Sequence, residues 1–390
     1  MNMDNSISSP LSPWLERLKG LASWVDLGRH RVGKGHATYF IAEIGNNHNG
    51  DYYLAKKSIE EAAKAGAHAV KFQKRFIKET FAKELLDKPQ TKENIKGRTY
   101  GEYREGLELS FDDFVKLKNL ADSLNVSFFA TPFDRKSVDF LESVGVPFYK
   151  IASFDLTNLP LLEYVARKRK PVILSTGMAT QEEVDEAVAT ILQHNSQLIM
   201  LHCVSVYPSP DEHINLDGML TMQERYAPIP VGYSGHEQDY LPTLTAIARG
   251  ASVVERHFTL SKLLPGPDHE SVSLDPHDFS GMVRDAERIR AISGVPNKRI
   301  LDEEVGTRNK HSKSIVARVA IPKGTVFTNS MLTVKSPGHG LKPREVSRLI
   351  GQKAAVDISE DTIIRADDVV WNEKVESPRK SGEKFERKEV

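Results

Sequence analysis

Residues 39–73 read YFIAEIGNNHNGDYYLAKKSIEEAAKAGAHAVKFQ and contain one complete strand–helix unit followed by the strand of the next. Tyr39–Glu43 and Ala69–Gln73 are short apolar runs that finish on polar residues, which is typical of buried strands in a parallel sheet. Between them, Tyr52–Ala65 has the spacing of an amphipathic helix. The stretch therefore predicts a βαβ arrangement.

The same alternation continues from residue 37 to about residue 292 and gives eight units. Eight βα units in about 255 residues match the usual size of a TIM barrel, (β/α)8, within the α/β class. Periodicity does not reveal strand order, so a doubly wound sheet is the alternative. The predicted strands are Tyr39–Glu43, Ala69–Gln73, Ser127–Thr131, Phe148–Ile151, Val172–Ser175, Leu198–His202, Pro230–Gly232 and Val253–Phe258.

The segments outside residues 37–292 differ in composition. Residues 1–36 are predicted to form an N-terminal extension with a short helix that packs on the barrel. Residues 293–313 are polar and contain Gly and Pro, so they are predicted to be a linker. Residues 373–390 are charge-dense and are predicted to be disordered. The helical stripe expected in the extension consists of Trp14, Leu15, Leu18, Leu21 and Val25.

Residues 314–372 carry a weak internal repeat with a period of 37 residues. Four apolar or hydroxyl positions recur at this offset, which indicates two similar halves. The segment is therefore predicted to be a small, pseudo-symmetric β-clip rather than a further βα unit. The paired positions are Ile321 with Ile358, Thr325 with Thr362, Phe327 with Ile364, and Leu332 with Val369.

The composition narrows the class of protein. Lys plus Arg and Asp plus Glu both number 53, so no net field attracts nucleic acid or an anionic membrane. Cys203 is the single cysteine and cannot form an intrachain disulfide, so nothing indicates an oxidising compartment. No apolar run reaches the roughly 18 residues of a membrane span, and the first residues lack the apolar core of a signal peptide. A cytoplasmic enzyme is expected.

Polar residues end the predicted strands, and a TIM barrel has its active site at the carboxyl ends of its strands. Lys71 and Lys150, with the hydroxyls of Thr131, Ser153 and Ser175, are expected to converge there. Cations and donors in this combination fit a phosphate or a carboxylate. The alternative for each lysine alone is a structural ion pair inside the barrel. No glycine-rich nucleotide-binding loop accompanies them.

His236 and His257 follow consecutive predicted strands and are expected to be neighbours at the barrel mouth. Two imidazoles there could bind a divalent metal while leaving positions open for water and substrate. A lone histidine is more often structural, but the pair, with Glu255 beside it, favours a metal site. His48, in the loop after the first strand, could join it.

Ordered motifs along residues 38–371 resemble those of the sialic acid synthase family. In the C-terminal part, IPKGT at 321–325 and SPGHG at 336–340 resemble that family's antifreeze-like (SAF) domain. The motifs of the barrel are AEIGNNHNG at 42–50, VKFQ at 70–73, YKIAS at 149–153, LSTGM at 174–178, GYSGH at 232–236, ERHFT at 255–259 and PGPD at 265–268.

The resemblance implies a synthase that condenses phosphoenolpyruvate with an N-acetylmannosamine-type aldehyde sugar, forming a nine-carbon 2-keto acid and phosphate. It also implies a manganese ion on His236 and His257, with magnesium or cobalt as alternatives. Residues that match phosphoenolpyruvate contacts are Lys71, Thr131, Lys150, Ser153, Ser175 and Ser234. Residues that match the sugar side are Glu43, Gln73, Tyr207 and Asp268.

A carboxylate suits this reaction because it can stabilise the cationic centre formed at C2 and activate the water that captures it. Glu43 is the first choice for that role. Asp155 stands where the resemblance suggests a second acidic group, and Glu255 could orient a metal-binding histidine.

Departures from the family pattern leave the acceptor open. Lys335 and Ser336 stand where such synthases usually carry an arginine that reaches the N-acyl group of the sugar. Ser205 stands where acetylneuraminate-forming members tend to have asparagine. The stretches VKFQKR at 70–75 and PVGYSGHE at 230–237 look closer to legionaminic-type synthases, which take a diacetamido sugar. A legionaminic- or pseudaminic-type acceptor is therefore an alternative.

The resemblance also implies a domain-swapped homodimer, in which residues 315–371 of one chain cover the barrel mouth of the other. The alternative is a C-terminal domain packed on its own barrel. Two further functions compete with the main one: another phosphoenolpyruvate aldol-type synthase of sugar acids, and a noncatalytic carbohydrate-binding protein. The retained Glu43, Lys71 and Lys150 argue against the second.

Overall fold

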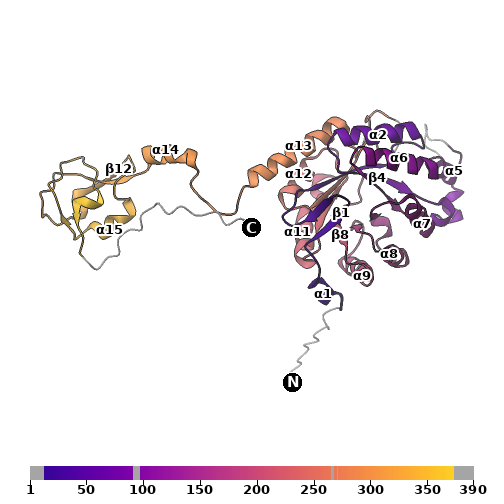
Figure 1. The fold of residues 1–390 in the computed structure, drawn as a ribbon, viewed down its shortest axis with the longest axis horizontal. Helices are drawn as coiled ribbons and strands as arrows, with labels where there is room; N and C mark the ends of the chain where they lie inside the picture. Colours follow the sequence, from indigo (N-terminus) through magenta and orange to yellow (C-terminus); the bar gives the residue numbers. More distant parts are fainter. Residues whose placement is uncertain (1–12, 91–96, 265–267, 270, 373–390) are drawn as a thin grey trace, which may run out of the picture. The chain divides into compact units, whose positions relative to one another are not determined.

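The computed structural model describes residues 13–90, 97–264, 268–269 and 271–372 (Figure 1). The chain divides into two compact units, residues 1–294 and residues 295–390. The expected disorder of residues 373–390 concerns a segment outside the described residues. No helix in the described ranges is long and apolar enough to cross a membrane.

The first unit is built on eight parallel strands. Their order is β5-β4-β3-β10-β9-β8-β7-β6, and the end strands β5 and β6 also contact each other, so the sheet curls into a TIM-like barrel. The TIM-barrel prediction is confirmed, and the doubly wound alternative is wrong because β3 lies next to β10. The strands are β3 (Tyr39–Gly45), β4 (Ala69–Lys74), β5 (Ser127–Pro132), β6 (Tyr149–Ile151), β7 (Val172–Ser175), β8 (Leu198–Cys203), β9 (Val231–Gly235) and β10 (Val253–His257).

Each strand is followed by a helix that packs outside the barrel (Figure 1). In α9 (Gln181–Leu192), Thr180 and Glu183 form a capping box at the start, and one face of the helix is buried. Short helices α3 (Ile77–Thr80), α4 (Lys83–Leu86) and α5 (Tyr100–Glu105) lie between β4 and its helix, and α10 (Asp211–Ile214) follows β8. The other outer helices are α2 (Tyr52–Lys64), α6 (Phe111–Ser123), α7 (Arg135–Val144), α8 (Leu159–Ala166), α11 (Leu216–Arg225), α12 (Leu241–Ala248) and α13 (Pro276–Ser293).

The segment before the barrel is not one continuous apolar stripe on a helix. Helix α1 (Pro13–Leu18) ends early, and Val25 belongs to β1 (Trp24–Leu27), which forms a hairpin with β2 (His30–Gly33). In β1, buried and exposed residues alternate, as expected for a strand. The apolar residues of this segment also fit a helical spacing, so the strand was not predicted. Leu27 and Val32 are fully buried in the barrel's core, so the hairpin packs on the barrel as the helix was expected to do.

Strand register brings three of the predicted site residues to one level of the barrel. His257 of β10 pairs with Glu43 of β3, and Glu43 pairs with Lys71 of β4. Immediately afterwards the β3–β4 register shifts, and Gly45 takes φ 56°, a left-handed conformation that favours glycine. The shift ends regular pairing beyond Glu43, at the carboxyl end of the strand.

The second unit begins in the polar segment predicted as a linker, which contains helix α14 (Asp302–His311). Its first turn is acidic and its last turn is basic, which favours a helix through the helix dipole. The linker prediction considered only the polar composition of the segment and therefore missed this helix. Short strands follow: β11 (Ser314–Ala317) pairs with β12 (Leu332–Lys335), and β13 (Lys353–Ala354) pairs with β14 (Val369–Val370). One short helix, α15 (Val346–Leu349), lies between β12 and β13.

The internal repeat of the second unit is visible in its hydrogen bonds. Ile321 and Ile358, which are equivalent positions of the repeat, exchange two backbone hydrogen bonds of 2.8 and 2.9 Å. Both side chains are buried in the unit's own core, together with Phe327, its repeat partner Ile364, and Leu332. The two halves of the repeat therefore face each other across one small hydrophobic core.

Candidate active site at the carboxyl ends of the barrel strands

Two lysines and two glutamates form a buried cluster inside the barrel. Lys71 Nζ lies 3.1 Å from Glu43 Oε1 and 3.5 Å from Glu255 Oε1. Lys150 Nζ lies 3.4 Å from the same Glu255 oxygen. All four side chains are nearly inaccessible to solvent, so each charge depends on the others. The second carboxylate oxygens, Glu43 Oε2 and Glu255 Oε2, have no hydrogen-bond partner among the described residues.

The two glutamates differ in protonation behaviour. Burial raises the pKa of Glu43, and the attraction of Lys71 offsets this only in part. Burial acts on Glu255 as well, but Lys150 and Lys71 together outweigh it and lower the pKa of Glu255. Glu43 is therefore the carboxyl group poised to exchange a proton, whereas Glu255 stays ionised between the lysines.

Hydroxyl groups extend the cluster around the barrel. Lys71 Nζ donates to Thr131 Oγ1 at 3.1 Å, and Lys150 Nζ donates to Ser175 Oγ at 2.7 Å. Ser234 Oγ lies 3.4 Å from Glu255 Oε1. The predicted convergence of the two lysines with these hydroxyls is present in the geometry, with donors from five strands directed at one region.

A second group of small residues lies next to Lys150. Ser153 Oγ accepts from the Gly177 backbone N–H at 3.0 Å, and Ser205 Oγ is buried without a partner in the described chain. A Cβ on Gly177 would lie 2.4 Å from Ser205 Oγ and 2.8 Å from Ser153 Oγ. The glycine, just after β7, therefore allows the two serines that follow the flanking strands β6 and β8 to lie close to the end of β7.

His236 and His257 are neighbours, with ring centroids 5.5 Å apart. His236 Nδ1 lies 2.9 Å from the Val204 carbonyl oxygen, which can only accept, so Nδ1 carries a proton and Nε2 is the ring nitrogen available to bind a metal. Burial, together with the charges of His236 and Lys71, holds the pKa of His257 well below its usual value. His257 is therefore neutral, and its Nδ1 lacks a hydrogen bond, so the pair of imidazoles at this point fits a divalent cation.

The predicted sugar-side residues line the same mouth. Gln73 Nε2 donates to Glu43 Oε1 at 2.8 Å, and the Tyr207 ring lies against His236 with centroids 4.1 Å apart. Asp268 Oδ2 lies 4.0 Å from His257 Nδ1. Asp155 is buried in a 3-10 turn after β6, where burial raises the pKa of its carboxyl group and Asn158 donates to it.

Comparison with known proteins identifies the family. Residues 58–298 match the model of the NeuB family, and residues 312–370 match the SAF domain. The chain belongs to the NeuB family. A NeuB-family relative in Homo sapiens, N-acetylneuraminate-9-phosphate synthase, is 38% identical over 85% of this chain and 93% of the relative.

Two further relatives support the assignment. N,N'-diacetyllegionaminic acid synthase of Legionella pneumophila is 36% identical over 85% of this NeuB-family chain and 94% of its own length. The crystal structure of N-acetylneuraminic acid synthetase from Leptospira borgpetersenii, in complex with citrate, is 35% identical with a TM-score of 0.65, covering 74% of this chain and 95% of that one. The chain is accordingly a C–C bond-forming synthase of nonulosonic, sialic-type sugar acids.

Some candidate residues of this NeuB-family chain lie elsewhere. His48 is buried, accepts from the Gly50 N–H, and has a pKa lowered to about 4, chiefly by burial, so it serves the loop rather than the site. Lys335 and Ser336 belong to the second unit. There Lys335 pairs with Asp361, and Ser336 Oγ donates to the His311 carbonyl oxygen at 3.0 Å.

Within the described ranges, Asp275, His277 and Asp278 form a further cluster that could hold a metal. Asp275 Oδ1 already accepts from the Asp278 N–H at 2.9 Å, as the cap of α13. Asp278 also pairs with Lys262 at 2.6 Å, and His277 is exposed. Capping and an ion pair account for this cluster better than a cation does.

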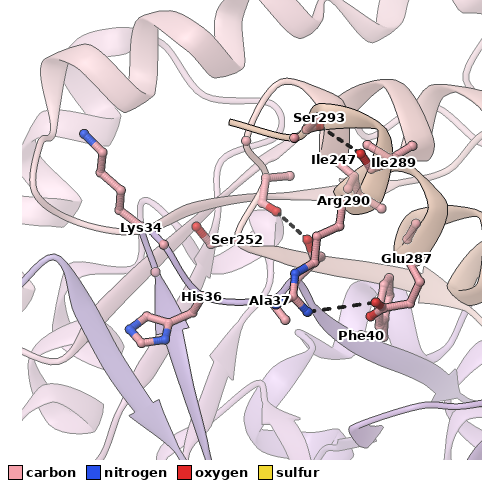
Figure 2. Close-up of a pocket in the computed structure, with 17 residues that line it drawn as sticks. Lys34, His36, Ala37, Phe40, Ile247, Ser252, Glu287, Ile289, Arg290 and Ser293 are labelled. Carbon is pink, nitrogen blue, oxygen red and sulfur yellow. Dashed lines mark hydrogen bonds and ion pairs between the residues drawn. The ribbon is translucent and has the colours of Figure 1, made fainter. Parts of the chain in front are cut away.

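A pocket of about 380 Å³ lies at the opposite, amino end of the barrel (Figure 2). Its polar side chains, Lys34, His36 and Arg290, stand apart around the rim, and Arg290 pairs with Glu287. Catalytic groups of TIM barrels come from the other face, so this pocket is not the candidate site.

Sequence reasoning missed two contributors. Asn46 Nδ2 donates to Gln73 Oε1 at 3.1 Å, so Asn46 orients Gln73, which in turn holds Glu43. Arg75, directly after β4, is buried beside Phe133 near the mouth. The signal for Asn46 was its place three residues beyond the predicted first strand. No sequence pattern around Arg75 distinguished this buried residue from a surface arginine.

Proposed function

We propose that this chain condenses phosphoenolpyruvate with the open-chain aldehyde of an N-acetylated hexosamine, forming a nine-carbon 2-keto sugar acid and inorganic phosphate. The observation that carries the proposal is the buried cluster in which Lys71 and Lys150 meet Glu43 and Glu255 beside the two histidines. The names of the human and Legionella relatives, which are sugar-acid synthases, support it.

Phosphoenolpyruvate carries a phosphate and a carboxylate whose charges repel each other. Lys71 and Lys150, with the hydroxyls of Thr131 and Ser175, offer cations and donors for both groups. The unpartnered hydroxyl of Ser205, with the hydroxyls of Ser153 and Ser234, suits the remaining phosphate oxygens. Binding the anion also offsets the cost of holding two lysines in a dry interior.

His236 and His257 are the residues proposed to hold a divalent metal, and manganese is the ion that the family resemblance favours. When bound, such an ion supplies Lewis-acid polarisation of the acceptor aldehyde. The Tyr207 ring packs against His236, and Asp268 faces His257, so both would border the acceptor at this point. The hydrogen bond of His236 to Val204 fixes its ring orientation.

Glu43 is the proposed general base. Attack of phosphoenolpyruvate C3 on the aldehyde leaves positive charge at C2, water adds to C2, and the tetrahedral intermediate loses phosphate by C–O cleavage. Glu43, held by Gln73 and Lys71, can stabilise the cationic centre and accept the proton of the water. Asp155 is the second proposed acidic group, and the ionised Glu255 positions both lysines.

The acceptor class has two alternatives. Acetylneuraminate-type synthesis uses a monoacetamido hexose, whereas legionaminic- or pseudaminic-type synthesis uses a diacetamido one. A panel of such aldehydes, with phosphate release from phosphoenolpyruvate as the readout, tests the function. Release that requires an N-acylated hexosamine supports the proposal. Release with only short aldose phosphates would indicate another sugar-acid synthase, and release with no aldehyde would contradict catalysis of this kind.

Replacing Lys150 is expected to weaken phosphoenolpyruvate binding selectively. Lys150→Ala removes a charge-assisted contact worth about 1.5–3 kcal/mol, so KM for phosphoenolpyruvate should rise roughly tenfold to a hundredfold. KM for the acceptor should change little. Initial-rate kinetics in which each substrate is varied separately measure both constants, and equal changes in the two would contradict the assignment.

We also propose that the enzyme works as a domain-swapped homodimer in the cytoplasm, with residues 315–371 of one protomer over the other's barrel mouth. A pocket of about 720 Å³ in the second unit supports this, because its lining is rich in cations suited to anionic substrates. The basic residues of this lining are Arg308, Lys313, His339, Lys342, Arg344 and Arg365.

Complementation tests the swap. A Glu43→Ala chain is mixed with a chain that ends before Ser314, and heterodimers are confirmed by mass. The intact barrel of the truncated chain should then be covered by the second unit of the Glu43→Ala chain, restoring activity at one mouth. Confirmed heterodimers without activity would count against the swap.

A further inference from the structure

A buried ion pair joins the residues next to the two histidines proposed to hold the metal. Arg256 lies between Glu255 and His257 on β10, and its side chain is fully buried. Its Nη1 donates to Glu237 Oε1 at 2.8 Å, and its Nη2 donates to the Glu237 carbonyl oxygen at 2.5 Å. Glu237 directly follows His236 and is buried as well. Each partner of the ion pair is therefore the sequence neighbour of one histidine.

The Glu237 carboxylate accepts hydrogen bonds at both of its oxygens. Oε1 accepts from Thr243 Oγ1 of α12 at 2.8 Å as well as from Arg256, and Oε2 accepts from the Tyr233 hydroxyl of β9 at 2.8 Å. A Cβ on Gly235 would lie 2.5 and 2.7 Å from the two carboxylate oxygens, so the glycine lets the carboxylate lie against the strand. The carboxylate is therefore held in one position between β9, α12 and β10.

The direction of Arg256 is linked to the directions of its neighbours on β10. Successive side chains of a strand point to opposite faces, so a residue anchored outward directs the residues on either side of it inward. Arg256 Nη1 donates to Thr243 Oγ1, on an outer helix, at 2.9 Å. Glu255 faces the other way and lies 3.5 Å from Lys71 inside the barrel. Anchoring Arg256 to the helix layer therefore holds His257 toward the interior.

The strand pairing that could hold the two histidines together stops just before them. Within the described ranges, the register of β9 with β10 ends at Gly235 and Arg256. The carbonyl oxygen of the histidine after β9 accepts from the Ser209 N–H at 2.9 Å, whereas that of the histidine ending β10 accepts from the Leu274 N–H at 2.8 Å. Each histidine is thus bonded to a different loop, and the bonds from Arg256 to Glu237 connect the two strand ends at this point.

We infer that Arg256 and Glu237 are positioning residues for the metal site, whose ion pair on the outer side of the barrel wall fixes His236 and His257 relative to each other on the inner side. This inference rests on the proposed function. The two rings, with centroids 5.5 Å apart, can share one ion only if a nitrogen of each stays within coordination distance of it. Partners that orient metal-binding groups typically contribute about tenfold to a hundredfold in metal affinity.

Manganese titration of the full chain, without substrates, tests the inference. Glu237→Gln keeps the shape of the side chain and removes the charge that balances Arg256. Calorimetry should show that this variant binds Mn²⁺ about tenfold to a hundredfold more weakly than the wild type. Its turnover should fall at limiting manganese and recover at saturating manganese, because the ligands themselves are intact. A purely structural ion pair would instead lower stability and leave the Mn²⁺ affinity of the folded protein unchanged.

Tyr233→Phe is the second variant, because it removes one hydrogen bond to Glu237 and keeps the aromatic ring in place. It should weaken Mn²⁺ binding by about threefold to tenfold. If circular dichroism shows that Glu237→Gln does not fold, this variant decides the question. Weaker Mn²⁺ binding by folded Tyr233→Phe supports the inference, and wild-type affinity overturns it.

Glu108→Gln is the matched control. Glu108 forms a similarly buried ion pair with Lys74, at 2.6 Å, at the end of β4, which carries no histidine. The control should lose stability and yet keep its Mn²⁺ affinity within about twofold of the wild-type value, since other residues orient the histidines. Equal weakening of Mn²⁺ binding in Glu108→Gln and Glu237→Gln would indicate a general loosening of the barrel and would overturn the inference.

The variant His257→Ala separates failure of this inference from failure of the proposed function. If the wild type binds no manganese, or if His257→Ala binds it equally well, the proposed metal site fails and the positioning role fails with it. If His257→Ala loses Mn²⁺ binding while folded Glu237→Gln retains wild-type affinity, the metal site stands and only the positioning role is overturned.

Discussion

His257→Ala is expected to reduce turnover by roughly 1,000-fold and to abolish the response to added manganese. The size of the effect reflects the several kcal/mol that Lewis-acid activation of a carbonyl contributes to a reaction of this kind. His236 alone would leave one imidazole to hold the ion. In the wild type, chelation should stop turnover and manganese should restore it, with metal binding measured by calorimetry in parallel.

His277→Ala is the matched control, because His277 belongs to the other histidine–carboxylate cluster, at the start of α13. This variant should retain both turnover and manganese affinity. If His277→Ala removes metal dependence while His257→Ala keeps it, the metal belongs to the α13 cluster. Full wild-type turnover in excess chelator would contradict a metal requirement altogether.

Lys71→Met is expected to be the most damaging change to the fold of the substrate-free site, costing about 3 kcal/mol of unfolding free energy at pH 8. Lys71 lies between Glu43 and Glu255, so its loss leaves two buried carboxylates near each other with only Lys150 to balance them. Lys71 also lowers the pKa of Glu43 against the effect of burial, so the pKa of Glu43 should rise further in the variant.

The loss of stability caused by Lys71→Met should depend on pH. A carboxyl group with a raised folded-state pKa destabilises the fold when it is ionised, and this penalty disappears as pH falls through that pKa. The deficit of Lys71→Met should therefore shrink between pH 8 and pH 5 in urea unfolding followed by circular dichroism. Lys57→Met, which removes an exposed lysine, should leave the urea midpoint essentially unchanged. A deficit that is constant with pH would contradict the proposed balance of charges.

The barrel could be predicted from sequence because each strand is buried on both sides and therefore reads as a continuous apolar run. Val172–Ser175 and Leu198–Cys203 are buried at every position, and their predicted bounds agree with the structure to within one residue. The β1–β2 hairpin was missed because a short amphipathic strand next to a helix has apolar residues at intervals that also fit a helix. Helix α14 was missed because its exposed sides leave no apolar period to detect.

The site residues that could be predicted from sequence are charged side chains within the apolar runs of the strands. Lys71, Lys150 and Glu255 carry charge inside apolar runs, which is expensive unless the charges meet, and the structure brings them together. The burial of Arg75 was not predictable, because only the fold places its guanidinium beside the Phe133 ring.

The exchange of hydrogen bonds between Ile321 and Ile358 has a consequence for how the second unit gains its stability. Each half supplies backbone hydrogen-bond partners to the other, and both halves contribute side chains to one hydrophobic core. Neither half therefore has a complete set of contacts alone. Truncation between the halves should leave an unfolded remnant rather than a smaller module, and the unit is expected to open in one cooperative step.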